Sequence, residues 1–81
     1  MEYKLTGALN EGVVRLESHQ YGTQLWTRGR ARKDCRCAGC SKNIAKKSDR
    51  FAPITNGYNR MERLCIRCVE RLVVGFRATS S

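Results

Sequence analysis

Two pairs of cysteines, each with two residues between its members, are the feature that most restricts how this chain can fold. Cys37 and Cys40 form the first pair, Cys65 and Cys68 form the second, and 24 residues lie between the pairs. A C-x2-C pair in a turn, or in the first turn of a helix, directs both sulfurs toward one point. Two such pairs supply the four ligands of a tetrahedral structural zinc site. The spacing therefore predicts one structural Zn²⁺ bound by these four cysteines.

The size of the chain makes a metal of this kind important for stability. A chain of 81 residues is expected to form a single domain, 1–81, and a domain this small usually needs a metal, disulfides or a partner. We find no signal peptide at its start, and its longest apolar run, "LVVGF", is too short to span a bilayer. We therefore expect a cytoplasmic protein with no membrane partner. In a reducing compartment, clustered cysteines bind metal more often than they form disulfides.

The fifth cysteine, Cys35, is left over by this pairing. Cys35 and Cys37 are two residues apart, so they lie on the same side of an extended chain and could compete for one coordination position. If Cys37 is the ligand, replacing Cys35 by serine should leave zinc binding intact, whereas replacing Cys37 should weaken it. The spacing alone does not assign a role to Cys35.

Other chemistry for the cysteines fits the sequence less well. Common ferredoxins place three cysteines close together and one apart, a pattern that differs from two C-x2-C pairs. A thiol redox site or a zinc-responsive thiol sensor remains a weaker alternative. A catalytic zinc needs an open position and a nearby acid or base, but the one histidine, His19, lies far from the cysteines in the sequence. We therefore expect a protein that is not an enzyme.

The residues before the cysteines favour β-structure. The stretches "YKLT", "VVRLES" and "YGTQLWT" alternate or are rich in β-branched residues, and glycines separate them. They predict a β-hairpin or meander within an N-terminal β layer, 1–34. A short helix over 10–19 is the competing interpretation, although Gly12 disfavours it by about 1 kcal/mol relative to alanine.

A hairpin and a helix are expected after the first cysteine pair. "FAPITNGYN" predicts two short extended segments joined by a type I′ turn at Asn56-Gly57, with Pro53 on an edge strand. The helix could begin near Arg60, capped by Asn59, or only at Cys65, and Gly75 marks its expected end. Residues 78–81 are expected to form a disordered tail. Apolar residues at three- and four-residue steps would share one helix face: Met61, Leu64, Cys65, Cys68, Val69, Leu72, Val73 and Phe76.

This order of elements resembles the four-cysteine treble-clef zinc finger. The stretch "CAGCSKNI", Cys37–Ile44, matches the CxGCxxxI pattern of many such fingers, in which the isoleucine leads into the hairpin. The resemblance covers Cys37 to Phe76 and implies a finger over residues 35–77, with a zinc knuckle, a β-hairpin and a C-terminal α-helix. We therefore expect a small α+β zinc-stabilised domain. Treble clefs bind DNA, RNA, proteins and lipids, so the resemblance implies no particular activity.

A second and looser resemblance extends to the N-terminal half. The motifs "YGTQLW" and "GRAR", the first C-x2-C pair and a later "FAP" are similar in order to a small bacterial domain family of unknown function. This likeness supports β-structure before the finger and implies nothing about activity.

Positive charge is concentrated after residue 27. The net charge of the chain is +9; residues 1–27 contribute two basic and three acidic side chains, and residues 28–81 contribute fourteen basic and four acidic ones. Such clustering favours an anionic partner, with nucleic acid first. We therefore expect a nucleic-acid-binding protein, DNA or RNA, that could serve in regulation. The alternative is a protein-interaction module that docks on an acidic partner, and the sequence does not indicate an oligomeric state.

The residues expected to contact phosphates surround the cysteines. Arginines at alternate positions of "RGRAR" would lie about 6–7 Å apart on one face of a strand. Arg60, Arg63, Arg67 and Arg71 would form a stripe along a helix that began at Arg60, or simply a solvated face. The predicted contact residues are Arg28, Arg30, Arg32, Lys33, Lys46, Lys47, Arg63 and Arg67.

Overall fold

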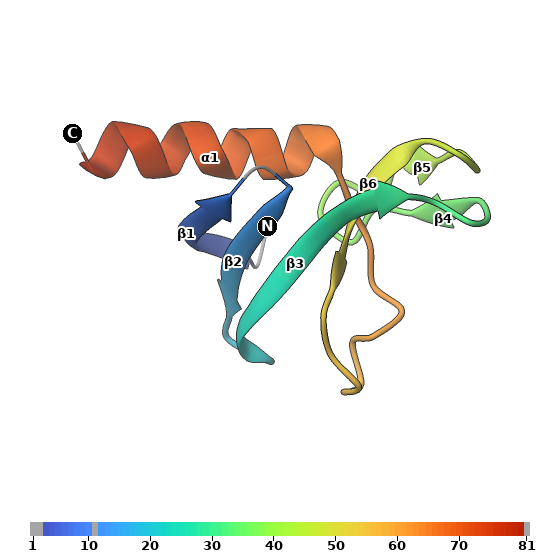
Figure 1. The fold of residues 1–81 in the computed structure, drawn as a ribbon, viewed down its shortest axis with the longest axis horizontal. Coiled ribbons are helices and arrows are strands. Elements are labelled where there is room, and N and C mark those ends of the chain that lie inside the picture. The colour runs from blue at the N-terminus through green and yellow to red at the C-terminus, as the bar shows by residue number, and fades with distance from the viewer. Residues whose placement is uncertain (1–2, 11, 81) are drawn as a thin grey trace.

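A curled antiparallel sheet of five strands and one C-terminal helix make up most of the fold (Figure 1). The structure, a computed structural model, describes residues 3–10 and 12–80. In spatial order the sheet contains β1 (Tyr3–Asn10), β2 (Val13–Ser18), β3 (Gly22–Arg30), β6 (Asp49–Pro53) and β7 (Leu64–Cys65). A second, two-stranded sheet pairs β4 (Cys35–Arg36) with β5 (Asn43–Ile44), and α1 spans Ile66–Ser80.

The first three strands form the meander that the sequence predicts. β1 pairs with β2, and β2 pairs with β3, both antiparallel. In β2 the side chains of Val14, Leu16 and Ser18 are buried, whereas Arg15 and Glu17 are exposed. This two-residue period is the burial pattern of a strand with one face on a core. The competing prediction of a helix over 10–19 is therefore wrong for its described residues, 10 and 12–19.

Strand β6 joins the N-terminal meander to the cysteine-containing half of the chain. It pairs with β3 on one side and with β7 on the other, so both halves share one sheet. β7 pairs only with Arg50 and Phe51, which leaves Pro53 beyond the end of that pairing. Proline lacks an N–H, so it fits where no neighbouring strand needs one. The predicted edge strand is therefore wrong, because β6 lies between β3 and β7, and Pro53 is accommodated beyond the end of the β7 pairing.

The predicted type I′ turn at Asn56-Gly57 is wrong. Such a turn needs positive φ at both central residues, and neither Asn56 nor Gly57 has one. A longer connection, residues 54–63, links β6 to β7 instead. Its anchor is Asn59, whose buried side-chain amide donates to Gln24 Oε1 at 2.6 Å and accepts from Gln24 Nε2 at 3.1 Å. A tight hairpin turn would not bring Asn59 to this partner on β3.

The helix starts within one residue of Cys65, the later of the two predicted starts. It begins at Ile66, directly after β7, so the start at Arg60 with Asn59 as cap is wrong. Gly75 lies within the helix, not at its end. A helical glycine costs about 1 kcal/mol, which packing of the neighbouring apolar residues offsets. The helix includes residues 78–80, which were expected in a disordered tail, and Ser81 lies outside the described residues.

Because α1 begins only at Ile66, the predicted stripe of four arginines along one helix is not formed. Arg60 and Arg63 precede β7 in the connection, so only Arg67 and Arg71 lie on α1, four residues apart. Met61 was expected on the apolar helix face; it lies in the same connection and is 62% exposed.

One hydrophobic core serves both halves of the chain. Trp26 is fully buried and its ring meets Tyr3 edge-on, with centroids 5.2 Å apart. The same cluster includes Leu64, Cys68 and Val69 from the C-terminal half. Helix α1 packs against β1 and crosses above the β1–β2 end of the sheet (Figure 1). The result is a small α+β domain in which one core connects the meander to the cysteine-containing segments.

The described residues contain no helix with both the length and the apolar character needed to cross a membrane.

Candidate metal centre

The four cysteines selected by spacing lie together in the structure. The sulfurs of Cys37, Cys40, Cys65 and Cys68 all lie within 4.8 Å of one another. Cys37 Sγ is 3.5 Å from Cys68 Sγ, and Cys40 Sγ is 3.7 Å from Cys65 Sγ. In a tetrahedral site with metal–sulfur bonds of about 2.3 Å, neighbouring sulfurs are about 3.8 Å apart. The four side chains are therefore positioned to hold a metal ion.

The first pair sits in the turn of the small β4–β5 hairpin. Cys37 N donates to the carbonyl oxygen of Lys42 at 2.9 Å, and Ser41 N donates to the carbonyl oxygen of Cys37 at 2.9 Å. Ser41 takes a positive φ of 64°, which lets the chain reverse within the turn. These contacts fold residues 37–41 so that Cys37 and Cys40 face the same point.

The second pair straddles the junction of strand and helix. Cys65 is the last residue of β7, and Cys68 lies in the first turn of α1. Cys65 is paired with Arg50 of β6, so the main sheet fixes its position. An additional bridge between Cys37 and Arg63, together with the 2.7 Å bond from Ala38 N to the Arg63 carbonyl oxygen, holds the turn against this segment. The two cysteine pairs meet because these non-local contacts hold them together.

Backbone N–H groups point at the sulfur of Cys37. Gly39 N and Cys65 N each lie 3.3 Å from Cys37 Sγ, and Cys40 N lies 3.5 Å from it. Burial alone raises the pKa of the Cys37 thiol, but these N–H donors outweigh burial and bring the pKa to about 6. Cys37 is therefore prepared to be a thiolate, the form that binds metal.

The second pair behaves differently from Cys37. Burial, followed by hydrogen bonding among the neighbouring thiols, raises the pKa of Cys68, and burial also raises that of Cys65. Several thiolates in so small a volume repel one another unless a cation lies between them. A divalent metal ion would remove this penalty, and four sulfurs would complete a tetrahedral shell, as in structural sites.

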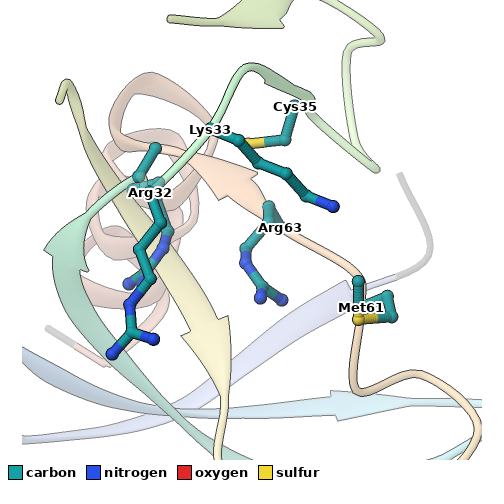
Figure 2. A pocket seen from close by; sticks show the side chains of 7 residues that line it. Arg32, Lys33, Cys35, Met61 and Arg63 are labelled. Atoms are coloured by element: carbon teal, nitrogen blue, oxygen red, sulfur yellow. The ribbon is translucent and has the colours of Figure 1, made fainter. Parts of the chain in front are cut away.

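Cys35 lies outside this group of four. It is half-buried in β4, opposite Ile44, and lines a cavity next to the metal site. In Figure 2 it stands close to Lys33, above Arg63. The spacing argument and the structure thus agree on which cysteines belong together.

The predicted phosphate-contacting residues fall into different environments. Arg28 and Arg30 lie on β3, but the strand ends at Arg30 and the chain bends at Arg32 and Lys33. The predicted row of three arginines on one strand is therefore only partly formed. The row stops at Arg30 because the pairing of β3 with β6 ends at the Arg30–Asp49 pair.

Arg28 is held by an acidic residue. Its Nη2 donates to Asp49 Oδ2 at 2.7 Å, and its Nε donates to the same oxygen at 3.3 Å. The hydrogen bond from Arg28, with the charges of Arg28 and Arg30, lowers the pKa of Asp49 below its ordinary value. Arg28 is thus less available to an outside anion than the sequence suggested.

The remaining predicted residues lie on three segments. Lys46 and Lys47 occupy the exposed turn between β5 and β6, and Arg67 is exposed on α1. Arg63 is half-buried, and its Nη1 donates to the carbonyl oxygens of Arg60 at 2.9 Å and Glu62 at 2.7 Å. The structure brings Arg63 together with Arg32 and Lys33 at the cavity that Cys35 lines.

Arg50 also lines this cavity, and it was absent from the predicted set. Its position depends on the register that places it opposite Gly29. A glycine on the facing strand could have indicated room for a large side chain, but the pairing partner is not evident from the sequence.

Protein-family models, curated proteins and solved structures contain no match to this chain. The arrangement of its residues is therefore the basis for the function proposed below.

Proposed function

We propose that residues 35–77 form a treble-clef finger that binds one structural zinc ion. The β4–β5 turn carries the first two ligands, β6 and β7 follow as a hairpin, and the second two ligands come at the end of β7 (Cys65) and in the first turn of α1 (Cys68). This order matches the knuckle, hairpin and helix of that finger. Four thiolates in a tetrahedral arrangement favour zinc, and the two separate C-x2-C pairs differ from the usual iron–sulfur spacing.

Elemental analysis tests this part directly. We expect one zinc per purified chain, and we expect a chelator to abolish cooperative unfolding, because zinc binding by small finger domains is coupled to folding. A folded protein that contains iron, or no metal after purification without chelator, would contradict it.

We further propose that the protein binds nucleic acid through the basic surface around this finger and catalyses no reaction. The observation that carries this proposal is the excess of exposed cations in residues 28–81. The chain has a net charge of +9; four thiolates with Zn²⁺ contribute −2 relative to four neutral thiols, which leaves +7. A phosphate backbone is the most common polyanion that such a surface binds.

The acidic residues of this region do little to neutralise its cations. Residues 28–81 contain four acidic side chains against fourteen basic ones, and among the described residues Asp49 forms an ion pair with Arg28. Asp34 accepts from the backbone N–H of Lys46, Asp49 from Arg28, and Glu62 from the hydroxyl of Tyr3. Because Arg28 is paired with Asp49, we assign the main contacts to the exposed side chains of Arg30, Arg32, Lys33, Lys46, Lys47 and Arg67.

Salt-dependent binding tests the proposal. The metal-loaded protein is titrated with duplex DNA, single-stranded DNA and structured RNA, each at 50 mM and 150 mM salt. Counterion release makes the logarithm of the affinity fall with the logarithm of salt, with a slope of about −0.9 per phosphate contacted in a duplex. Four such contacts predict about a 50-fold loss over this range. Absence of binding to all three at 50 mM salt would refute the proposal.

A pair of charge-matched variants locates the surface. Arg30→Gln with Lys46→Gln removes two charges around the finger, whereas Lys4→Gln with Arg15→Gln removes two from β1 and β2. We expect the first pair to weaken binding and to reduce the salt slope by about two, and the second to change it little. Equal losses from both pairs would place the interface elsewhere.

A further inference from the structure

A cavity beside the four clustered cysteines is lined by four cations and, among the described residues, by no acidic side chain. Its volume is about 440 Å³, and Arg32, Lys33, Arg50 and Arg63 line it together with Cys35 and Met61 (Figure 2). These cations come from three segments that are distant in sequence: the bend after β3, strand β6 and the residue before β7. Like charges gathered in one cavity repel one another, so an anion bound there would lower their energy.

Arg50 is the most informative member of the group. Its Nε is buried and has no hydrogen-bond partner among the described residues, which costs free energy in a folded protein. Burial, and then the charges of Arg63 and Arg32, lower its pKa. The guanidinium lies over Gly29, where a Cβ would come within 2.8 Å of Arg50 Nη1. The missing side chain at Gly29 thus leaves room for the guanidinium of Arg50.

A second arginine of the group, Arg63, is also held in place. Arg63 Nη1 donates to two backbone carbonyl oxygens, those of Arg60 and Glu62, which holds its guanidinium at the cavity. In Figure 2 the side chains of Lys33 and Arg63 extend toward the same region, with Met61 at its edge. A fixed guanidinium loses little side-chain entropy when it binds an anion.

We propose that this cavity binds a phosphate monoester, either a free nucleotide or the 5′-phosphate at the end of a nucleic-acid strand. Guanidinium groups match phosphate oxygens bidentately, and several cations suit the two negative charges of a terminal phosphate. The volume is in the range of small-ligand sites, and the side chains of Ala31 and Met61 add apolar lining for a nucleoside. Binding of a free nucleotide does not depend on the wider basic surface. Binding of the 5′-phosphate of a nucleic-acid strand rests on the function proposed above.

Binding of AMP, with adenosine as the uncharged control, tests the site. The metal-loaded, ¹⁵N-labelled protein is titrated with each at 150 mM salt. We expect saturable shifts of the amide signals of Gly29, Arg50 and Arg63 with AMP and not with adenosine. Equal responses to both, or no saturable response to AMP at millimolar concentration, would overturn the proposal.

Substitutions at two glycines separate the effect of the position of Arg50 from the effect of the positive charge at the site. Gly29→Ala keeps every charge but displaces Arg50, so we expect AMP to bind several-fold more weakly. Gly7→Ala is the matched control, because a Cβ added at Gly7 on β1 would likewise come within 2.9 Å of an arginine nitrogen, Arg15 Nη2. It should leave the AMP affinity unchanged.

Lys33→Gln, at an exposed position, should weaken AMP binding at least about ten-fold, the usual effect of losing a charged hydrogen bond. Equal effects of the two glycine variants, or unchanged AMP affinity in both Gly29→Ala and Lys33→Gln, would refute the site.

Oligonucleotides that differ only at the 5′ end identify the source of the phosphate. Tighter binding of the 5′-phosphorylated strand than of the 5′-hydroxyl strand, with the difference lost in Gly29→Ala, would support the strand end as the ligand. Equal binding of both strands together with AMP binding would support a free nucleotide. AMP binding without binding of any nucleic acid would refute the function proposed above and leave this site standing. Salt-dependent binding of nucleic acid without AMP binding would support the function proposed above and refute this site.

Discussion

The contrast between Cys37→Ser and Cys35→Ser is the sharpest test of the metal centre. The two residues are two positions apart, and both side chains end in a thiol. Cys37 is 2% exposed, its Sγ lies 3.5 Å from Cys68 Sγ, and three backbone N–H groups point at it. Cys35 is half-buried and lies outside the cluster. The two substitutions should therefore have very different effects.

The expected size of the difference follows from these contacts. Disturbing a residue that merely supports a metal ligand typically costs 10- to 100-fold in affinity, so losing a ligand should cost more than about 100-fold. Structural zinc contributes roughly 10–16 kcal/mol in finger peptides, comparable to the whole stability of a small domain. We therefore expect Cys37→Ser to lose most of its thermal stability. Cys35→Ser removes no ligand and should change the free energy of unfolding by about 1 kcal/mol or less.

Two measurements decide the outcome. Competition with a chromogenic chelator gives the zinc affinity of each variant, and thermal unfolding followed by circular dichroism gives its stability. The metal content of the purified protein serves as a readout even if Cys37→Ser fails to fold. Equal loss of zinc affinity from both substitutions would show that Cys35 shares the coordination, and the assignment of four ligands would then be wrong.

Three further predictions concern the fold. Leu64→Ala removes a fully buried side chain and should lower the free energy of unfolding by about 2–5 kcal/mol in chemical denaturation. Asn59→Ala breaks two hydrogen bonds to Gln24 and should cost about 1–3 kcal/mol, with a clear coupling energy in the double-mutant cycle with Gln24→Ala. Asp49 has a lowered pKa, so its ion pair with Arg28 stabilises the fold above the ordinary carboxyl pKa and stops doing so as the pH falls through the lowered value. Arg28→Gln should therefore raise the pKa of Asp49 toward its ordinary value in an NMR titration.

Each of these predictions has an outcome that would contradict it, and the first also has a control variant. Met61→Ala, at an exposed position, should change stability by less than about 0.5 kcal/mol, and a similar loss at Leu64 would contradict the core described above. Strict additivity of the Asn59 and Gln24 substitutions would mean that the pair is not coupled in solution. An unchanged pKa of Asp49 in Arg28→Gln would show that another group lowers it.

Local sequence patterns were sufficient for some elements of the fold. The β-branched and apolar residues of "VVRLES" predicted a strand, and β2 confirms it, because side chains of this kind favour strands wherever they occur in a short run. The C-x2-C spacing likewise selected the four clustered cysteines, since each pair is geometrically prepared by its own turn or helix start. In both cases the information lies within a few adjacent residues.

Other features depended on residues far apart in the chain. Helical spacing between Met61 and Leu64 suggested an early helix start, but pairing of Leu64 and Cys65 with β6 keeps them in a strand. The Asn56-Gly57 pair suggested a tight turn, but the buried bonds between Asn59 and Gln24 hold a longer connection. Tertiary contacts outweighed local propensities that are worth only about 1 kcal/mol each.

The sequence by itself therefore determined which four cysteines cluster, the β-rich first half and the strongly basic character of the second. Only the tertiary structure decided which cations meet. The register of β3 against β6 places Gly29 opposite Arg50, and the connection before β7 brings Arg63 to the same cavity. A shift of one residue in that register would turn Arg50 to the other face of the sheet, because side chains alternate along a strand. Register is set by burial of the shared core, so no short stretch of sequence encodes it.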